Sequence, residues 1–311
     1  MKRYYIFILL LFILCSISCS DVTDYSLNMN TNYPICDNIP LGNGQKTKVI
    51  ILLGQSNASG CSIVEYLKLN TTAEEFNKYE QGFNNIYINY CIDDHLFSSN
   101  GKFVNVDLTC GCGNGFFGPE VGMSEILSSE FSNETIFILK YTMSGYSLNH
   151  HWLNNRKRGD IYDACIKYLY TYLDFLITKN YNISVDAICW MQGESDTTNE
   201  KGKLYYNNQK AFVSYLRSDL AKYNKNIYFI DAGISSSPYC LPAYDLVNDA
   251  KFKFSELSEL NIYFSTIANG LTTLYEPDYD PDLGHYDSLS EIKLGHLFAQ
   301  EIVKIYKKSS I

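Results

Sequence analysis

Five short apolar runs alternate with amphipathic stretches along the chain. The apolar runs are residues 49–53, 136–139, 185–190, 227–230 and 262–267. A short continuous apolar run is typical of a strand buried on both faces, as in a parallel sheet. Three of the intervening segments place apolar side chains along one helical stripe: residues 160–179, 200–223 and 288–307. This alternation predicts an α/β domain with a mostly parallel central sheet and helices on both faces.

Two segments lie outside this alternation. Residues 21–46 are polar and predict an N-terminal extension. Residues 60–118 show weak periodicity and contain many Asn, Gly and Tyr residues, so they predict an irregular insertion. With no internal repeat or low-complexity linker, the remaining chain predicts one domain over residues 47–311.

The first twenty residues have a pattern of their own. Lys2 and Arg3 precede an apolar run from Tyr4 to Leu14, and small serine residues follow it. This pattern is typical of a secretory signal peptide, and the run is shorter than the ~20 residues that span a bilayer. We therefore expect residues 1–20 to be removed, leaving a secreted or extracytoplasmic protein with no stable membrane span.

Charge and cysteine content narrow the class of protein further. The net charge of the 311 residues is −9, and loss of Lys2 and Arg3 makes it −11. Such a chain lacks the excess of basic residues that is typical of a nucleic-acid-binding protein, so no nucleic-acid partner is expected.

Eight cysteines would remain after signal removal. An even number in an exported chain predicts disulfides without giving their pairing, although Cys165 and Cys189 lie on apparent core elements and are candidates for buried thiols.

Candidate catalytic residues follow the predicted strands. Ligands bind beyond the carboxyl ends of the strands in an open parallel sheet. Ser56 follows the first apolar run, and Asp282 and His285 precede the last helix. A serine hydroxyl needs a base to act as a nucleophile, and His285 can be that base. Asp282, three residues earlier, can accept the other ring N–H and fix the tautomer of His285.

The remaining candidates would support this chemistry. Donors for an oxyanion hole, which stabilises developing negative charge, are the backbone N–H groups of Ser56 and Gly145 and the side chain of Gln192. Glu194 is open to two interpretations: a structural tie within its loop, or an acid partner of the histidine in place of Asp282. Three further residues are candidates for substrate contact or for support behind the site: Gln55, Asn57 and Trp152. Trp152 fits a core position equally well.

These candidates fall within five motifs in a fixed order along the chain. The motifs are Gly54-Gln55-Ser56-Asn57, Gly118-Pro119-Glu120, Lys140 through Gly145 with Ser147, Leu148 and Trp152, Trp190-Met191-Gln192-Gly193-Glu194-Ser195-Asp196, and Asp282-Leu283-Gly284-His285. Over about residues 47–305 the chain resembles the SGNH hydrolases. The resemblance is to the branch that contains sialate O-acetylesterases and the acetylxylan esterases of carbohydrate esterase family 6.

The resemblance implies a flavodoxin-like three-layer αβα sandwich and a metal-free serine esterase. It implies Ser56 as nucleophile, His285 as base and Asp282 as its acid partner, with Ser56, Gly145 and Gln192 around the oxyanion. The implied substrate is an O-acetylated carbohydrate, either sialic acid or a plant or microbial polysaccharide. The chain has Ser144-Gly145 where the family usually has Gly-Gly, which leaves the choice of sugar open.

No cofactor is expected. The segment Gly113–Gly118 matches G-x-G-x-x-G, but it follows the irregular region instead of the first strand, where a dinucleotide fingerprint belongs. His150 and His151 have no third metal ligand at a recognisable interval. The alternative functions are a catalytically inactive sugar-binding protein on the same fold and a lipid or thioester hydrolase of the same superfamily.

Overall fold

The computed structural model describes residues 27–309, so the predicted signal peptide lies outside the described residues. The core of the molecule is one sheet with strand order β12-β11-β10-β1-β7-β3-β4, and β5 pairs with β3 as well. The strands that run parallel are β1 (Lys46–Gly54), β3 (Phe83–Ile92), β7 (Ile136–Thr142), β10 (Asn182–Met191), β11 (Tyr228–Ala232) and β12 (Asn261–Phe264). The short strands β4 (Phe97–Ser98) and β5 (Val104–Val106) are antiparallel to β3.

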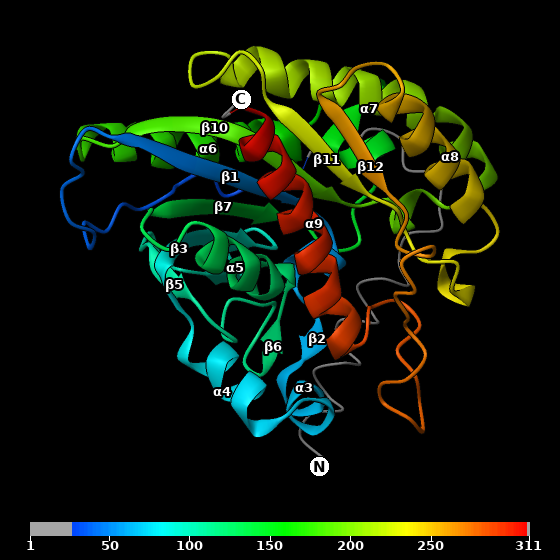
Figure 1. Cartoon of the computed structure of the whole chain (residues 1–311). Helices are drawn as coiled ribbons and strands as arrows, with labels where there is room; N and C mark the ends of the chain where they lie inside the picture. Colours follow the sequence, from blue (N-terminus) through cyan, green and yellow to red (C-terminus); the bar gives the residue numbers. More distant parts are fainter. Residues whose placement is uncertain (1–26, 310–311) are drawn as a thin grey trace.

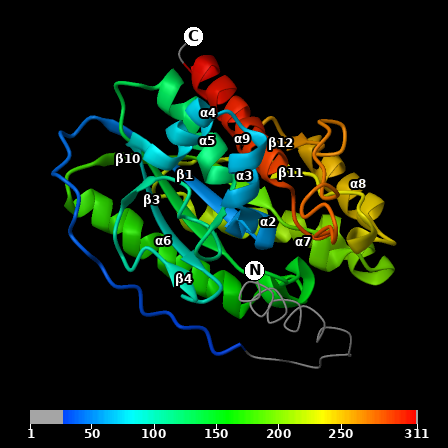
Figure 2. The same cartoon turned by 90° about the horizontal axis from the view of Figure 1, so that it is seen from below.

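Helices cover both faces of this sheet. α5 (Pro119–Glu130) and α9 (Ser288–Ser309) pack together over one face (Figure 1), and α6 (Asp160–Thr178) and α7 (Asn199–Leu220) lie on the opposite face (Figure 2). The other helices are α2 (Ser56–Ser59), α3 (Val64–Asn70), α4 (Ala73–Gln81) and α8 (Tyr244–Ser255). The predicted fold class, an α/β sandwich with a mostly parallel central sheet, is confirmed.

Short elements in the connecting segments complete the fold. They are the two-stranded sheets β2 (Ser62–Ile63) with β6 (Phe116–Phe117) and β8 (Leu153–Asn154) with β9 (Lys157–Arg158), and the short helices η1 (Leu148–Trp152), η2 (Glu194–Asp196) and η3 (Pro238–Cys240). All three short helices lie in loops near the carboxyl ends of the parallel strands.

The prediction of an irregular insertion over residues 60–118 is wrong in part. β3 lies inside this segment and pairs with β7 as a full strand of the central sheet. Its sequence alternates Asn and Tyr with apolar residues, which hides the continuous apolar run of a buried strand. The fully buried Asn89 is tolerated because its amide donates to the carbonyl of Lys102 at 2.9 Å and its Oδ1 accepts from the hydroxyl of Tyr168 at 2.8 Å.

The register of the sheet aligns the carboxyl ends of its central strands. Gly54, the last residue of β1, pairs with Thr142 on one side and with Met191 on the other, and these are the last residues of β7 and β10. The same Thr142 pairs with Ile92, the last residue of β3. The segments that follow all four strands therefore start at one edge of the sheet.

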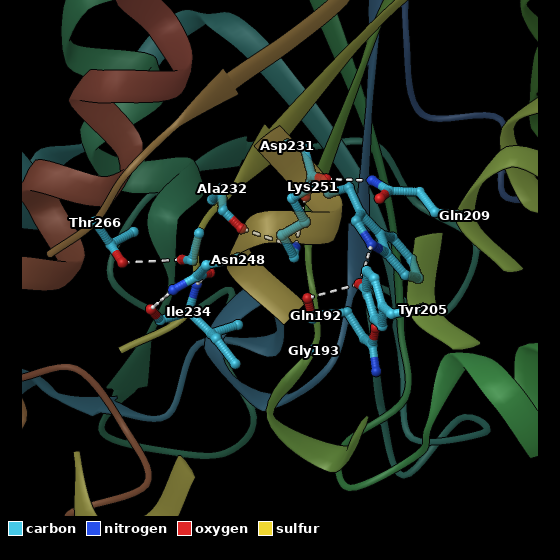
Figure 3. Close-up of polar contacts among 12 residues, drawn as sticks. Gln192, Gly193, Tyr205, Gln209, Asp231, Ala232, Ile234, Asn248, Lys251 and Thr266 are labelled. Atoms are coloured by element: carbon cyan, nitrogen blue, oxygen red, sulfur yellow. Dashed lines mark hydrogen bonds and ion pairs between the residues drawn. The ribbon is translucent and has the colours of Figure 1, made fainter. Parts of the chain in front are cut away.

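A buried ion pair joins this sheet to α8. Lys251 donates to Asp231 Oδ1 at 2.6 Å and to the carbonyl of Ala232 at 2.9 Å, and Gln209 donates to the other oxygen of Asp231 (Figure 3). Both charged side chains are almost fully excluded from solvent. Burial raises the pKa of Asp231 to about 6, against the opposing effects of Lys251 and Gln209. Removing one partner would leave an uncompensated charge in the interior.

We expect Lys251→Met to lower the free energy of unfolding by roughly 3–5 kcal/mol, because it leaves the Asp231 carboxylate without its ammonium partner. Urea denaturation followed by circular dichroism measures this loss. The double variant Asp231→Leu/Lys251→Met is the control, because it removes both charges. The double variant should recover much of the lost free energy of unfolding. A double variant that is as unstable as Lys251→Met, or less stable, would contradict this account.

Candidate active site

Ser56 lies at the sharp turn between β1 and α2. Gly54 precedes it with φ +150°, and a Cβ at this position would lie 2.0 Å from the carbonyl oxygen of Met191. Only glycine fits between the two strands there. Ser56 is the first residue of α2, so its backbone N–H belongs to the helix turn that has no intrahelical acceptor. The turn thus places the Ser56 hydroxyl and a backbone N–H without an intrahelical acceptor together at the edge of the sheet.

Asn57 joins the Ser56 turn to the segment that carries His285. Its Oδ1 accepts from the backbone N–H of Tyr286 at 3.1 Å, and its Nδ2 donates to the carbonyl of Gly284 at 3.3 Å. The two residues that flank His285 are therefore both bound to the side chain next to Ser56. Nδ2 also donates to Glu194 Oε1 at 2.7 Å. One buried amide thus connects three of the predicted motifs.

The predicted histidine and aspartate pair is formed. His285 Nδ1 lies 2.7 Å from Asp282 Oδ2, and Asp282 Oδ1 accepts from the backbone N–H groups of Gly284 and His285 at 2.9 and 3.2 Å. Since Nδ1 is taken by Asp282, the other ring nitrogen, Nε2, is the one left for proton transfer. Among the described residues Ser56 Oγ forms no hydrogen bond with His285. Hydrogen bonds between catalytic groups often form only in the complex with substrate.

The surroundings of His285 increase its basicity. Burial by itself would lower the pKa of the imidazole, but the Asp282 carboxylate and its hydrogen bond raise it, and Glu194 adds to the increase. Burial would conversely raise the pKa of Asp282, and the charge and hydrogen bonds of His285 and the loop hold it below its ordinary value. The pair is therefore arranged to stabilise an imidazolium ion.

Glu194 supports the loop instead of pairing with the histidine in this arrangement. Its Oε1 accepts from Asn57, and its Oε2 is buried without a hydrogen-bond partner. Burial raises the pKa of this carboxyl group, an effect that Asn57 partly opposes. Of the two acids that the sequence left open, Asp282 is the one that contacts His285.

The prediction that Gln192 offers an N–H to the oxyanion differs from what the structure shows. Gln192 is fully buried, and its Nε2 donates to Asp196 Oδ2 at 2.6 Å and to the carbonyl of Tyr146 at 3.3 Å. Its Oε1 accepts from the hydroxyl of Tyr205 at 2.9 Å (Figure 3). Both amide hydrogens are thus engaged, and Gln192 braces the loops behind the site.

Asp196 is a supporting residue that the sequence analysis did not single out. Its carboxylate accepts from the backbone N–H groups of Leu148 and Asn149 at 2.7 and 3.3 Å, at the start of η1. Negative charge at a helix N-terminus is stabilising. The sequence signal for this role was the Asp at the end of the Trp190–Asp196 motif. The side chain of Asp often accepts from the unpaired backbone N–H groups at the start of a helix.

Gly145 lies in the loop after β7, and a carboxylate holds this loop on each side of it. Asp196 binds the backbone at Leu148 and Asn149, after Gly145, and Asp93 binds the backbone at Ser144, before it. Asp93 Oδ1 accepts from the backbone N–H of Ser144 at 2.6 Å, which ties the loop to the segment that follows β3. Gly145 has φ +77°, a left-handed conformation that suits glycine. Its backbone N–H remains the predicted second donor to the oxyanion, and it follows Ser144, which Asp93 holds in place.

Two of the other candidates are structural. Trp152 is fully buried and packs edge-on against Trp190 and Phe212, which is the core position of the two that the sequence left open. Gln55 is buried, and its Oε1 accepts from the backbone N–H of Ser195 at 3.3 Å. Through this oxygen Gln55 holds the loop that begins at Gly193.

Within residues 27–309 no cluster of three or more His, Cys, Asp or Glu side chains is arranged to hold a metal ion. Over the same residues no helix is long and apolar enough to cross a bilayer. His151, one of the two adjacent histidines, instead lies 3.0 Å from the hydroxyl of Ser147 through its Nδ1. Burial lowers the pKa of His151 to about 4.

Ser56 and the His285–Asp282 pair lie at the carboxyl edge of a parallel α/β sheet, an arrangement that is compatible with an ester hydrolase. The sequence of residues 46–304 matches the family described as carbohydrate esterase, sialic acid-specific acetylesterase. The chain belongs to this family. The prediction of a carbohydrate esterase is therefore confirmed at the level of enzyme class.

Solved structures share the fold at low sequence identity. A protein from Arabidopsis thaliana has a TM-score of 0.58 at 18% identity, over 83% of this chain and 98% of its own. The structure of NanS has a TM-score of 0.59 at 14% identity, over 87% of this chain and 99% of its own. A carbohydrate acetylesterase from Xanthomonas citri has a TM-score of 0.54 at 14% identity, over 81% of this chain and 54% of its own. A search of curated proteins found no match.

We expect Asn57→Ala to lower kcat/KM on 4-nitrophenyl acetate by roughly 10²-fold, because small displacements of catalytic groups have effects of this size. The substitution releases both neighbours of His285 from the Ser56 turn. Stopped-assay kinetics on the purified variant measure the loss.

The matched control for this variant is Asn85→Ala. Asn85 also makes three side-chain hydrogen bonds, to Phe131, Glu134 and Ser128, but it lies near the start of β3, away from the carboxyl ends of the strands. It should lose stability and keep kcat. If both variants lose activity equally, Asn57 has no special role in positioning the histidine.

Proposed function

We propose that this chain is a secreted serine esterase that removes O-acetyl groups from carbohydrates through an acyl-enzyme intermediate. The observation that carries the proposal is the 2.7 Å contact between His285 Nδ1 and Asp282 Oδ2, on a loop that Asn57 binds to the Ser56 turn. These contacts connect Ser56, near the start of the domain, with Asp282 and His285, near its end, and this supports the proposed roles of nucleophile, orienting acid and base.

The acylation step uses Ser56 and His285. Ser56 Oγ attacks the carbonyl carbon of the acetyl ester while His285 Nε2 accepts the hydroxyl proton. The imidazolium that forms is stabilised by Asp282. The proton then passes to the departing sugar oxygen, and the C–O bond to the sugar breaks. The products of this step are a free sugar hydroxyl and acetyl-Ser56.

Deacylation repeats the sequence with water. His285 accepts a proton from a water molecule that attacks the acetyl carbonyl, and returns it to Ser56 Oγ as the ester bond breaks. Acetate leaves and the serine is restored. In both steps the backbone N–H groups of Ser56 and Gly145 are the proposed donors to the oxyanion, each donor of this kind being worth roughly 10²–10³ in turnover.

We propose O-acetylated sialic acid as the first substrate to test, since the family is described as specific for sialic acid esters. O-acetylated polysaccharide is the second, since the Xanthomonas citri neighbour is a carbohydrate acetylesterase. The ring of Tyr239 supports a sugar substrate of either kind. This ring is 46% exposed and adjoins Gly284, where a Cβ would lie 3.8 Å from its Cγ. It provides an aromatic surface next to Gly284, the residue before His285.

Export of the protein is also part of the proposal. The basic, apolar and small-residue order of residues 1–20 supports removal of a signal peptide and an extracytoplasmic site of action. O-acetylated glycans of the cell surface and of secreted polymers would be accessible there.

We expect Ser56→Ala to release acetate at least roughly 10³-fold more slowly than wild type from acetylated sialosides, acetylated xylan oligomers and 4-nitrophenyl acetate, with an unchanged circular dichroism spectrum. The reason is the loss of the only oxygen that can form the acetyl-enzyme. Enzymatic acetate detection measures the rate.

Two further measurements distinguish the rival functions. Labelling of wild type, but not of Ser56→Ala, by a fluorophosphonate would exclude an inactive sugar-binding protein. Rates that fall from acetyl to longer acyl chains would exclude a lipid hydrolase. A wild-type rate in purified Ser56→Ala would refute the mechanism.

The raised pKa of His285 predicts the pH dependence of activity. Below this pKa the imidazole is protonated and cannot accept the serine proton, so kcat/KM should fall as the pH drops through a value above the ordinary histidine pKa of about 6.5. Asp282→Asn removes the carboxylate that raises the pKa. It should move the acid limb to lower pH and reduce kcat by roughly 10³–10⁴-fold.

Glu194→Gln is the matched control for this prediction. It removes a carboxylate that is more deeply buried than that of Asp282, contacts Asn57 and makes no hydrogen bond to His285 among the described residues. Its acid limb should move less than that of Asp282→Asn. A larger shift in Glu194→Gln would make Glu194 the acid partner of the histidine.

A further inference from the structure

Two cysteines face each other in the segments that flank the candidate active site. Cys61 follows α2, and Cys112 precedes β6. Their sulfur atoms lie 2.8 Å apart, about 0.75 Å more than a covalent S–S bond of ~2.05 Å. Both side chains are buried, and they form a small cluster with Ile92. All eight cysteines within residues 27–309 are thiols in this structure, and no bonded pair is present there.

The backbone around the two thiols is already closely packed. The N–H of Cys112 donates to the carbonyl of Gly60 at 3.0 Å, one residue before Cys61. A Cβ at Gly60 would lie 2.4 Å from Gly118 Cα. β2 and β6 pair immediately beyond, with Ser62 opposite Phe117. A bond between the sulfur atoms therefore needs only a small adjustment of side chains, without movement of the two segments.

The pair is also close to the catalytic loop. Ser62, next to Cys61, donates through its hydroxyl to the carbonyl of Tyr286 at 2.7 Å, and Tyr286 follows His285. The hydrogen bond with Cys112 and burial raise the pKa of Cys61, and the Asp282 carboxylate adds to this increase. The two segments that carry the cysteines thus hold one side of the histidine loop.

We propose that Cys61 and Cys112 form a disulfide bond in the exported protein, which fixes the segment after the nucleophile turn to the segment before α5. The two thiols lose two protons and two electrons as the S–S bond forms. The oxidant is a small-molecule or protein disulfide, which is reduced to two thiols by thiol–disulfide exchange. The proposal rests on the predicted export and is independent of whether the chain hydrolyses sugar esters.

The other described cysteines do not offer an equivalent pair. Cys240 contacts the hydroxyls of Ser235 and Ser237, and Cys165 and Cys189 are fully buried on α6 and β10. Within residues 27–309 no other two sulfur atoms are in contact. The even number of cysteines therefore reflects one bridge and several buried thiols.

Thiol counting tests the proposed bond directly. The full chain is produced in an oxidising secretory host, denatured without reductant, alkylated with N-ethylmaleimide and weighed by mass spectrometry. We expect two fewer modified cysteines than after reduction, and a proteolytic fragment that joins residues 61 and 112. Cys61→Ser and Cys112→Ser should each abolish this difference, while the control Cys189→Ser should retain it. Full alkylation of the unreduced wild type, or a fragment that joins other cysteines, would overturn the proposal.

A second measurement on the folded wild type does not depend on the variants. Reduction with a phosphine should lower the Tm by about 5–10 °C, since opening a bridge across some fifty residues releases the unfolded chain. Cys189→Ser should show the same shift, and an unchanged Tm in both proteins would contradict the bond. Neither measurement uses esterase activity, so a failure here is distinguishable from a failure of the proposed function.

Discussion

The parallel register of β1 with both of its neighbours is the constraint on which the site depends. Gly54 pairs with the last residue of β7 and the last residue of β10, so three chain segments leave the sheet at the same place. A Cβ at Gly54 would collide with the backbone of β10, and the close approach that glycine permits lets the chain turn at once into Ser56. Without this register, the Ser56 turn, the loop with Gly145 and the loop with Glu194 would not share one edge.

The histidine loop reaches that edge through side-chain hydrogen bonds instead of sheet pairing. Asn57 holds the backbone on both sides of His285, and Ser62 holds the carbonyl of Tyr286. Side chains next to Ser56 therefore place His285, and Asp282 contacts the Nδ1 atom of its ring. The position of the His285–Asp282 pair therefore depends on side chains in the segment around Ser56.

Buried polar groups fill the space behind the site. Asp196 caps η1 and accepts from Gln192, and Lys251 with Asp231 anchors α8 to the sheet. Such groups stabilise a fold only when their partners are in place, and they hold loops in one arrangement when they are. The family motif around Gln192 and Glu194 is thus explained by loop support as much as by chemistry.

The sequence by itself determined the α/β class, most of the parallel strands and the residues that could act as nucleophile, base and acid, because apolar periodicity and short motifs are local properties. It missed β3, where Asn and Tyr interrupt the apolar pattern and bury their polar atoms in tertiary hydrogen bonds. Tertiary structure alone decided that Asp282, and not Glu194, contacts His285, that Gln192 and Trp152 are buried, and that Cys61 faces Cys112. These outcomes depend on which loops meet in space, and a motif specifies the residues of a loop but not the atoms that they will contact.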